Sequence, residues 1–452
     1  MDYKGKKVVV IGLADSGVAA ARWLVHRGAH VTVTDKKSAA ELEGPLAAIA
    51  GSGIATALGG HPDSIFADAD LIVVSPGVPK SLPQLVAAMA RKVPVWSEME
   101  MAARDVKAPI LAITGTNGKT TVTTLLGEIM KAHLGEKEVF VGGNIGTPLT
   151  ELLIEGRSVK AAVVEVSSFQ LEFVDRFHPR VAVILNITDD HLDRYSGFDE
   201  YAEVKWRVFA RQTGDDAAVL VVDDPVVARN ARRIKTALYA VSLEKHPARG
   251  MWRHGEALEY VTPGQEPLLL PIAEVPLHGL HNLQNVMAAV AAAVAAGVPF
   301  ETARRVVKNF KGLAHRLELT RVRRGVSYYD DSKGTNTGAV EAAVIGLSRP
   351  VYLLMGGQAK GCSFLDLAEK IKGAARRVYA FGECREQLLT EMGPKVPVTV
   401  VETMREALAA AAAAAKPGDA VLLSPACASF DQFKSYKDRG EQFQKMVMEL
   451  PD

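Results

Sequence analysis

The chain has 452 residues, of which 48% are hydrophobic and 23% are charged, and its formal net charge is +1. This length exceeds one ordinary hydrophobic core, so we expect a soluble globular protein of two or three domains. The near balance of charges argues against a protein that captures nucleic acid through a broad basic surface, or that binds an anionic membrane.

The start of the chain and its cysteines indicate the cytoplasm. Residues 1–7 lead straight into an apolar strand, so we expect no signal peptide. The apolar segment 286–298 is too short to span a bilayer. The cysteines have neither the number of a disulfide framework nor the spacing of a metal site, as is typical of a reducing compartment; they are Cys362, Cys384 and Cys427.

Residues 1–100 form the first predicted domain, which is Rossmann-like. An apolar strand, Val8–Ile11, leads into a glycine turn, Gly12–Gly17, and then into an amphipathic helix. A second strand ends at Asp35, and an acid about twenty residues beyond the turn is typical of dinucleotide-binding folds. Ala14 stands where that pattern has its second glycine, so the turn could also be only a tight connection. We predict that this domain holds a nucleotide-like group, with NAD as one option.

The second domain is predicted over residues 101–312 and begins with a phosphate-binding loop. A short apolar strand runs into Gly115-Thr-Asn-Gly-Lys-Thr-Thr121 and a helical pattern. The backbone N–H groups of such a turn bind anionic oxygens, while Lys119 adds positive charge and the Thr120 hydroxyl binds Mg²⁺. Ile113 stands where the P-loop pattern has its first glycine, and the alternative is a strand–turn–helix connection with a solvated lysine. The glycine-rich turn, Lys119 and Thr120 together favour ATP or GTP as the ligand.

Polar residues follow the next apolar strands of this domain. Glu165 lies at the end of a strand within residues 161–166 and is predicted to bind Mg²⁺ beside Thr120, the alternative being an ion pair with Lys or Arg. His191 follows the strand 181–187, where a metal ligand and a hydrogen-bonded structural residue are equally well supported. Continuous apolar strands of this kind are typical of a parallel sheet covered on both faces.

Two parts of the second domain have no clear role from their residues alone. Lys205 lies in a helical segment, 200–209, and by itself is best interpreted as a solvated lysine. Residues 215–280 show no regular pattern, and an alanine-rich helix from near His281 is expected to close the domain.

The third predicted domain, residues 313–452, is again Rossmann-like. Its apolar strands alternate with helices: Val351–Met355, Val378–Phe381 and Val421–Leu423. Arg316 suits a phosphate, because a guanidinium matches it bidentately, while Asp331 and Lys333 could serve a ribose or a second substrate. The alternative is a charged hinge loop. Two further loops follow strand ends, where binding residues are common: 356–360 and 424–429.

Motifs along the whole chain together resemble the Mur ligases, the ATP-dependent amide-forming enzymes of peptidoglycan precursor synthesis. They cover essentially the full sequence in the family's order: Gly115–Thr120, Glu165–Ser168, Asn186–His191, His281–Asn285, His315–Arg316 and Asp331–Lys333. Two segments, Asp331–Asn336 and Ser424–Phe433, resemble the branch that adds D-glutamate. The resemblance implies an α/β protein with a central P-loop domain between two Rossmann-like domains, and UDP rather than NAD in the first.

The resemblance also implies roles for individual residues. ATP would be held by Gly115, Thr116, Asn117, Gly118, Lys119, Thr120, Thr121, Asn282, Asn285, Arg316 and Asp331. Two Mg²⁺ ions would be bound by Thr120, Glu165, His191 and a carbamylated Lys205. The UDP-linked substrate would contact Leu13, Ala14, Asp15, Ser16, Asp35, Lys36, Ser75, Asn144 and Ser167. D-Glutamate would lie among Thr335, Lys360, Ser429 and Tyr436.

The resemblance implies Lys119, His191 and Lys205 as catalytic residues. Lys205 would take part as a carbamate, because carbamylation turns its ammonium into an anion that binds metal. The carboxylate of UDP-N-acetylmuramoyl-L-alanine would attack ATP, and D-glutamate would capture the acyl phosphate. We expect a monomer whose domains close about hinges near 97–108 and 310–315. Three alternatives stay open: a folylpolyglutamate synthase-like ligase of the same fold, an NAD-dependent oxidoreductase, and a non-catalytic ATP-gated binding module.

Overall fold

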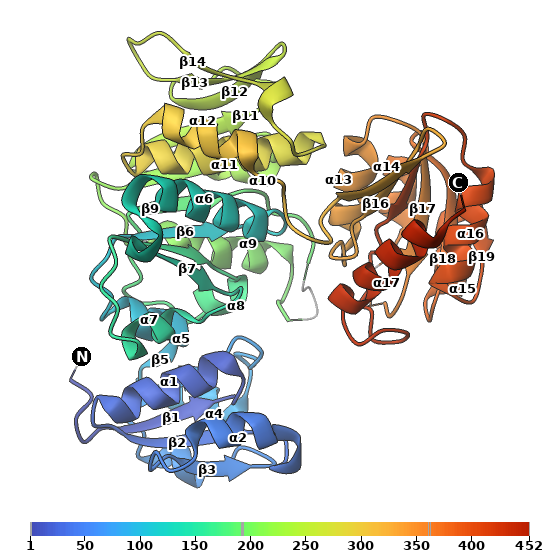
Figure 1. Ribbon diagram of the computed structural model, residues 1–452. Coiled ribbons are helices and arrows are strands. Elements are labelled where there is room, and N and C mark those ends of the chain that lie inside the picture. The colour runs from blue at the N-terminus through green and yellow to red at the C-terminus, as the bar shows by residue number, and fades with distance from the viewer. Residues whose placement is uncertain (1, 191–193, 360, 362, 452) are drawn as a thin grey trace. The chain divides into compact units, whose positions relative to one another are not determined.

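The computed structural model describes residues 2–190, 194–359, 361 and 363–451, and it contains three β-sheets that follow one another along the chain (Figure 1). The predicted site residues His191 and Lys360, together with Cys362, lie outside the described residues. The chain divides into two compact units. One comprises residues 1–272 and 286–307, and the other comprises residues 273–285 and 308–452. The domain limits at 100 and 312 stay predictions.

The first sheet has five parallel strands in the order β3-β2-β1-β4-β5. The strands are β1 (Lys7–Ile11), β2 (His30–Asp35), β3 (Ala55–Leu58), β4 (Leu71–Val74) and β5 (Val95–Ser97). The helices between them are α1 (Asp15–His26), α2 (Glu43–Ile49), α3 (Ser64–Ala67) and α4 (Pro83–Ala90), with α5 (Glu98–Ala103) following. The chain reverses its direction of winding between β1 and β4, which is where such sheets bind ligands.

The central sheet has nine strands in the order β14-β13-β12-β11-β10-β9-β6-β8-β7. All are parallel from β7 to β12, and β13 and β14 add an antiparallel edge. The strands are β6 (Ile110–Thr114), β7 (Val139–Gly143), β8 (Ala161–Glu165), β9 (Val181–Ile184), β10 (Ala217–Val221), β11 (Ala237–Ser242), β12 (Gly250–His254), β13 (Ala257–Val261) and β14 (Leu268–Pro271). The helices are α6 (Lys119–Leu134), α7 (Leu149–Ile154), α8 (Ser168–Leu171), α9 (Phe198–Trp206), α10 (Pro225–Asn230), α11 (Leu280–Ala295) and α12 (Phe300–Asn309).

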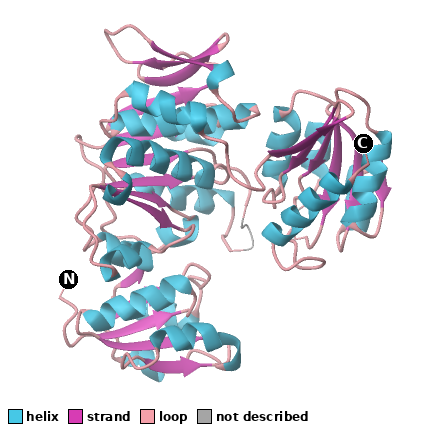
Figure 2. Cartoon of the chain, viewed as in Figure 1, coloured by secondary structure: helices cyan, strands magenta, loops and turns pink. Residues whose placement is uncertain are grey.

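The third sheet has six strands in the order β15-β16-β20-β17-β18-β19, parallel except for the edge strand β15. The strands are β15 (Glu318–Arg323), β16 (Val326–Asp330), β17 (Val351–Gly356), β18 (Ala375–Phe381), β19 (Val398–Val400) and β20 (Ala420–Leu423). The helices are α13 (Thr337–Gly346), α14 (Leu365–Ile371), α15 (Arg385–Met392), α16 (Met404–Ala414) and α17 (Tyr436–Glu449). Helices cover both faces of this sheet (Figures 1 and 2).

Each sheet buries both of its faces, which explains the continuous apolar strands. Successive strand residues point to opposite faces. In the first sheet Val10 packs in the cluster that contains Leu24 of α1, whereas Ile11 packs in the cluster that contains Leu85 of α4. The C-terminal sheet divides its core in the same way. The predicted α/β class is confirmed.

The segment 215–280, which showed no regular pattern in the sequence, contains the strands β10 to β14. The edge strand β14 exposes Leu268 and Leu269, so its residues do not follow the all-buried pattern of the inner strands. The predicted alanine-rich helix is α11, which begins at Leu280. Among the described residues, no helix is long and apolar enough to cross a membrane.

Candidate functional site

The predicted phosphate loop connects β6 to α6, and glycines shape it. Gly118 is the residue that precedes the helix, with φ +86°, a conformation that glycine adopts without strain. Gly115 has φ +147°, and a Cβ on it would lie 3.1 Å from the Cβ of Leu185. The first turn of α6 contains no acidic residue that would compete for the site, and the N–H groups at a helix N-terminus favour an anion.

Asn186, at the end of the neighbouring strand, holds this loop in place. The backbone N–H of Thr116 donates to the carbonyl of Asn186 at 2.9 Å. The N–H of Asn117 donates to the Asn186 side-chain oxygen at 2.8 Å, and the Asn186 amide donates back to the Asn117 carbonyl at 3.1 Å. The motif Asn186–His191 therefore starts with a residue that shapes the loop.

Two lysines meet at this loop. Lys119 Nζ donates to the carbonyl oxygens of Gly115 and Thr116 at 3.0 and 2.7 Å, and Lys205 Nζ donates to the same Gly115 oxygen at 2.9 Å. Lys205 is buried, and its Nζ lies 4.6 Å from the ring centroid of Tyr201. Burial and the nearby charge of Lys119 lower the pKa of Lys205 well below its usual range, although Asp190 and Glu165 oppose the shift. The solvated interpretation of Lys205 is wrong.

Tyr201 lies on α9 one turn before Lys205 and contacts the loop directly. Its hydroxyl lies 3.0 Å from the Thr116 hydroxyl, which also lies 3.1 Å from the Thr188 carbonyl. Burial raises the pKa of Tyr201 far above its usual value, so the phenol stays protonated. The sequence analysis assigned Tyr201 no role, although its spacing of four residues places it on the same helix face as Lys205.

Glu165, at the carboxyl end of β8, has one satisfied and one free oxygen. Asn144 donates its side-chain amide to Glu165 Oε1 at 2.8 Å and its backbone N–H to the Glu165 carbonyl at 2.8 Å. The buried Oε2 has no hydrogen-bond partner among the described residues. Gly143 permits the close approach, since a Cβ there would lie 2.4 Å from the Glu165 carbonyl oxygen. A buried carboxylate oxygen without a donor suits a bound cation.

The residues predicted for the UDP-linked substrate in the first domain lie at the carboxyl ends of β1, β2 and β4. Asp35 accepts the N–H of Leu13 at 2.8 Å and that of Lys37 at 2.9 Å, so it shapes the glycine turn. Ser75 Oγ donates to the Gly12 carbonyl at 3.0 Å. Ala14 and Asp15 are exposed at the start of α1. The other two predicted residues, Asn144 and Ser167, follow strands of the central sheet.

In the C-terminal unit, Asp331 is held from two sides. Ser424 Oγ donates to Asp331 Oδ2 at 2.7 Å, and the backbone N–H of Leu317 donates to Oδ1 at 3.2 Å. Burial raises the pKa of Asp331 to about 7, against the lowering effects of these hydrogen bonds and of Arg316. Arg316 lies between two residues with positive φ, His315 at +61° and Leu317 at +47°.

The residues predicted to contact adenine lie at the start of α11. Asn282 donates its side-chain amide to the His278 carbonyl at 2.7 Å. Asn285 donates to the side-chain oxygen of Asn282 at 3.1 Å, and both side chains are buried. The pair forms a small polar patch whose orientation is defined by hydrogen bonds.

Three residues predicted for the amino acid lie at the carboxyl edge of the C-terminal sheet. Thr335 follows β16, Ser429 follows β20, and Tyr436 begins α17. Ser332 Oγ donates to the Tyr436 carbonyl at 2.8 Å, and Lys333 Nζ lies 4.0 Å from the Tyr436 ring centroid. The fold thus places loops from different parts of the sequence beside one another.

Comparison with known proteins matches three successive segments of the chain. Family models match residues 6–97 (Mur ligase MurD-like, N-terminal domain), 113–293 (Mur ligase middle domain) and 315–427 (Mur ligase, glutamate ligase domain). A UDP-N-acetylmuramoylalanine–D-glutamate ligase of Geotalea daltonii is 46% identical over 100% of this chain and 99% of its own. The chain belongs to the Mur ligase family. A second enzyme with the same name, from Acidobacterium capsulatum, is 44% identical over 99% of this chain and 97% of its own.

Solved structures support the three-domain Mur ligase fold. A pseudomurein peptide ligase type C of Methanothermus fervidus matches with a TM-score of 0.61 and 20% identity, over 99% of this chain and 100% of its own. The UDP-N-acetylmuramate–alanine ligase of Thermotoga maritima matches with a TM-score of 0.59 and 17% identity, over 98% and 99% of the two chains. At these identities the likeness concerns the fold alone.

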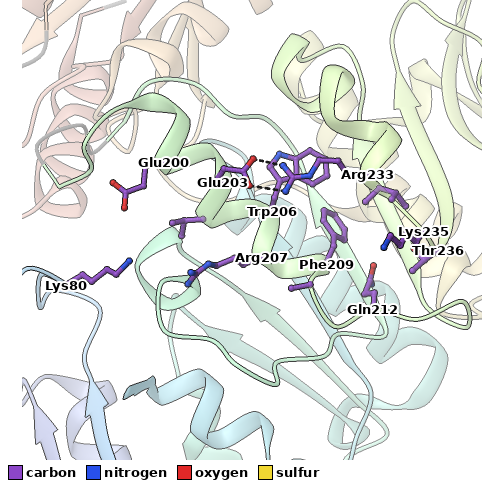
Figure 3. A pocket seen from close by; sticks show the side chains of 13 residues that line it. Lys80, Glu200, Glu203, Trp206, Arg207, Phe209, Gln212, Arg233, Lys235 and Thr236 are labelled. Atoms are coloured by element: carbon purple, nitrogen blue, oxygen red, sulfur yellow. Dashed lines mark hydrogen bonds and ion pairs between the residues drawn. The ribbon is translucent and has the colours of Figure 1, made fainter. Parts of the chain in front are cut away.

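A cavity of about 560 Å³ in this Mur ligase lies on another face of α9 (Figure 3). It contains none of the residues predicted for ATP, metal or substrates. An ion pair between Arg233 and Glu203 lies at its edge. Three polar atoms of its lining are buried without a hydrogen-bond partner among the described residues: Trp206 Nε1, Gln212 Oε1 and Thr236 Oγ1. The cavity is large enough for water molecules that would satisfy these atoms.

Proposed function

We propose that this Mur ligase joins D-glutamate to UDP-N-acetylmuramoyl-L-alanine while converting ATP to ADP and phosphate, a step of peptidoglycan precursor synthesis. The observation that carries the proposal is the full-length identity of 42–46% to enzymes named UDP-N-acetylmuramoylalanine–D-glutamate ligase. No comparable observation supports the folylpolyglutamate synthase-like or NAD-dependent alternative. We further propose that the enzyme acts in the cytoplasm, where ATP and nucleotide-linked precursors are available, and that it is a monomer.

The phosphate loop is the proposed site of the ATP phosphates. The N–H groups at the start of α6 and the charge of Lys119 suit the β- and γ-phosphates. Lys119 Nζ rests on two loop carbonyls, so it is already held beside the position that the phosphates would take. Asn282, Asn285, Arg316 and Asp331 are proposed to bind the adenosine part and the terminal phosphate.

We propose that two Mg²⁺ ions bind near the loop. The unpartnered Oε2 of Glu165 and the Thr120 hydroxyl would bind one ion, and His191 with a carbamylated Lys205 would bind the other. Lys205 suits carbamylation because it is buried and has no ion-pair partner within 4.0 Å among the described residues. Bound Mg²⁺ supplies positive charge that screens the phosphate oxygens from the incoming carboxylate.

The chemistry then proceeds in two displacements. An oxygen of the L-alanine carboxylate attacks the γ-phosphorus, the bond to the β–γ bridging oxygen breaks, and ADP leaves. The amine of D-glutamate attacks the acyl carbon, the bond to the phosphate oxygen breaks, and phosphate leaves while the amine loses a proton. The protein's part is mainly to position the three substrates and to exclude water from the acyl phosphate.

Product analysis tests the proposal. The purified enzyme is incubated with ATP, Mg²⁺ and UDP-N-acetylmuramoyl-L-alanine, together with D-glutamate, L-glutamate, D-alanine or L-lysine in separate reactions. Mass spectrometry should detect the ligated UDP product with D-glutamate only, in an amount equal to the ADP released. A product with another amino acid, or a rate of ADP release that does not depend on D-glutamate, would overturn the assignment.

A further inference from the structure

Arg439 on α17 is fully buried, and its guanidinium is surrounded by oxygen atoms of loops. Nε donates to Ser332 Oγ at 2.9 Å, and Nη2 donates to the Ser332 carbonyl at 2.8 Å. Both Nη atoms donate to the Cys427 carbonyl at 3.2 Å. Nη1 makes two longer contacts of 3.5 Å, to the carbonyls of Gly356 and Ala428. One side chain therefore joins four residues of the backbone.

These four residues belong to three different loops. Ser332 follows β16, Gly356 ends β17, and Cys427 and Ala428 follow β20. The strands are neighbours in the order β16-β20-β17, so their carboxyl ends lie side by side at one edge of the sheet. The planar fork of a guanidinium, with five N–H groups, can bond to several carbonyls in one plane, which a lysine cannot do.

The backbone around Arg439 is packed too closely for other arrangements. Gly357 has φ +127°, and a Cβ on it would lie 2.2 Å from the Ala428 carbonyl oxygen and 3.3 Å from Arg439 Nη1. The backbone of Gln358 pairs with that of Ala428 in both directions, at 2.9 and 3.0 Å. The loops after β17 and β20 are thus fixed to each other and to Arg439.

Arg439 lacks the partner that a purely structural buried cation usually has. No carboxylate lies within 4.0 Å of its guanidinium among the residues that the structure describes, and only neutral oxygens accept its hydrogen bonds. Burial lowers the pKa of Arg439 to about 10, so the group still carries its charge at neutral pH. The carboxylates of Asp431, Asp330 and Asp331 act on this charge only from beyond that distance, so the direct partners of Arg439 are the loops, and we expect its main role to be in shaping them.

Two of these loops carry residues already proposed for D-glutamate, and a third such residue begins α17. Thr335 lies three residues beyond Ser332, and Ser429 directly follows Ala428. Tyr436 lies one turn before Arg439 on α17, and its carbonyl accepts the hydrogen bond of Ser332 Oγ at 2.8 Å. Arg439 is therefore bonded to Ser332 and Ala428, which lie three and one residues before Thr335 and Ser429, and it shares α17 with Tyr436.

We propose that Arg439 is a positioning residue for the amino-acid substrate, because it holds the loops that carry Thr335 and Ser429 in one arrangement with α17, which carries Tyr436. The proposal rests on the proposed function, in which these loops bind D-glutamate. It assigns Arg439 to the second displacement, since D-glutamate takes part only there.

The test is the variant Arg439→Lys, which keeps the charge but loses the planar fork. We expect the KM for D-glutamate to rise at least 10-fold, while the KM values for ATP and UDP-N-acetylmuramoyl-L-alanine change less than threefold. ADP–ATP isotope exchange in the presence of the UDP substrate alone should keep more than half of its rate, because it needs only the first displacement.

The matched control is Arg321→Lys. Arg321 also donates to backbone carbonyls of the same unit, those of Val447, Met448 and Leu450, but at the opposite end of α17. This control should leave all three KM values within twofold of the parent enzyme. If Arg439→Lys changes the three KM values alike, or lowers only Tm and the active fraction, the positioning role is wrong.

A milder variant covers the case in which Arg439→Lys does not fold. Ser332→Ala removes the side-chain oxygen that accepts from Arg439 Nε. It should raise the KM for D-glutamate about threefold, again without a change for ATP, and an unchanged KM would contradict the proposal.

The proposed function and the role of Arg439 can be refuted independently of each other. A parent enzyme that does not use D-glutamate refutes the proposed function, whereas a parent that uses it beside variants with unchanged D-glutamate KM refutes only the role of Arg439.

Discussion

Lys119 and Lys205 donate hydrogen bonds to the same acceptor, the backbone carbonyl oxygen of Gly115, at 3.0 and 2.9 Å. Two ammonium groups at one carbonyl would repel each other strongly in a buried setting. The pKa of Lys205 is lowered well below its usual range by burial and by Lys119, which removes this repulsion. A carbamate on Lys205 would replace the repulsion by an attraction, because it would place a negative charge beside the Lys119 ammonium.

Lys205→Ala should therefore reduce kcat by a factor on the order of 10² to 10³, the range seen when one preorganised electrostatic group is removed. Acetate or formate added at millimolar concentrations should restore part of the activity, because a small carboxylate can replace the carbamate. The measurement is the rate of ADP release at saturating substrates, with and without the added acid.

The control for Lys205 is Lys235→Ala, which removes an exposed lysine at the cavity on another face of α9. It should leave both kcat and the response to acetate unchanged. Full activity of Lys205→Ala without any added carboxylate would remove the proposed role.

The raised pKa of Asp331 predicts a pH-dependent stability of the C-terminal unit. Burial raises this pKa from 3.8 to about 7, so the folded state binds a proton that the unfolded state releases between these values. Stability that comes from this proton is present below pH 4 and is lost as the pH rises to 7. The full loss is on the order of 4 kcal/mol at most, since one pKa unit corresponds to about 1.4 kcal/mol.

Asp331→Asn isolates this effect because the amide does not titrate. The free energy of unfolding of the variant minus that of the parent should increase from pH 5 to pH 7 and stay constant above pH 8. All four tryptophans lie in the other unit, so the transition is best followed by far-UV circular dichroism. A constant difference across pH 5–8 would show that Asp331 is ionised in the folded protein throughout.

Glu100 should be a main source of stability in the N-terminal unit. Its buried carboxylate accepts three backbone N–H groups, those of Asp175, Arg176 and Phe177, and pairs with Arg104 at 2.7 Å. Glu100→Ala leaves these donors unpaired and removes one of the two carboxylate partners of Arg104, so we expect a loss of about 3 kcal/mol.

Denaturation followed by tryptophan fluorescence measures this loss, since all four tryptophans lie in the same unit as Glu100. The control is Glu128→Ala, which breaks an exposed pair with Lys131 and should cost less than about 1 kcal/mol. Equal losses in the two variants would contradict the structural importance of Glu100.

Substrate binding should bring the two compact units into a closed form. The chain passes from one unit to the other after residues 272, 285 and 307, and the last of these crossings is close to the predicted hinge at 310–315. The other predicted hinge, 97–108, contains Glu100. The carboxylate of Glu100 accepts hydrogen bonds from the backbone of residues 175–177, which ties this segment to the central part of the same unit. Small-angle scattering should show a smaller radius of gyration with a non-hydrolysable ATP analogue and the UDP substrate. Identical profiles with and without these ligands would argue against closure.

Local patterns in the sequence predicted the glycine-rich turn between β6 and α6 and the inner strands well. The strands β6, β8 and β9 are buried on both faces, so their apolar runs are continuous and recognisable. Gly115 and Gly118 adopt positive φ values that few other residues tolerate, so their spacing carries the loop's geometry. Both features depend on residues that are neighbours in the chain.

Features that depend on distant residues escaped prediction. Lys205 lies on a helix rich in charged residues, and only the fold shows that it is buried against Gly115. Cys384 and Cys427 are 43 residues apart, yet their sulfur atoms lie 3.2 Å from each other in the core. Arg439 is one basic residue in a polar helix until β16, β17 and β20 bring their loops around it.

The central claim is that the γ-phosphate of ATP activates the L-alanine carboxylate. It is tested most directly with UDP-N-acetylmuramoyl-L-alanine that carries ¹⁸O in both oxygens of that carboxylate. An acyl phosphate passes one carboxylate oxygen to the phosphate when D-glutamate displaces it, so each released phosphate should carry one ¹⁸O atom. Phosphate without ¹⁸O, formed together with the ligated product, would contradict the account.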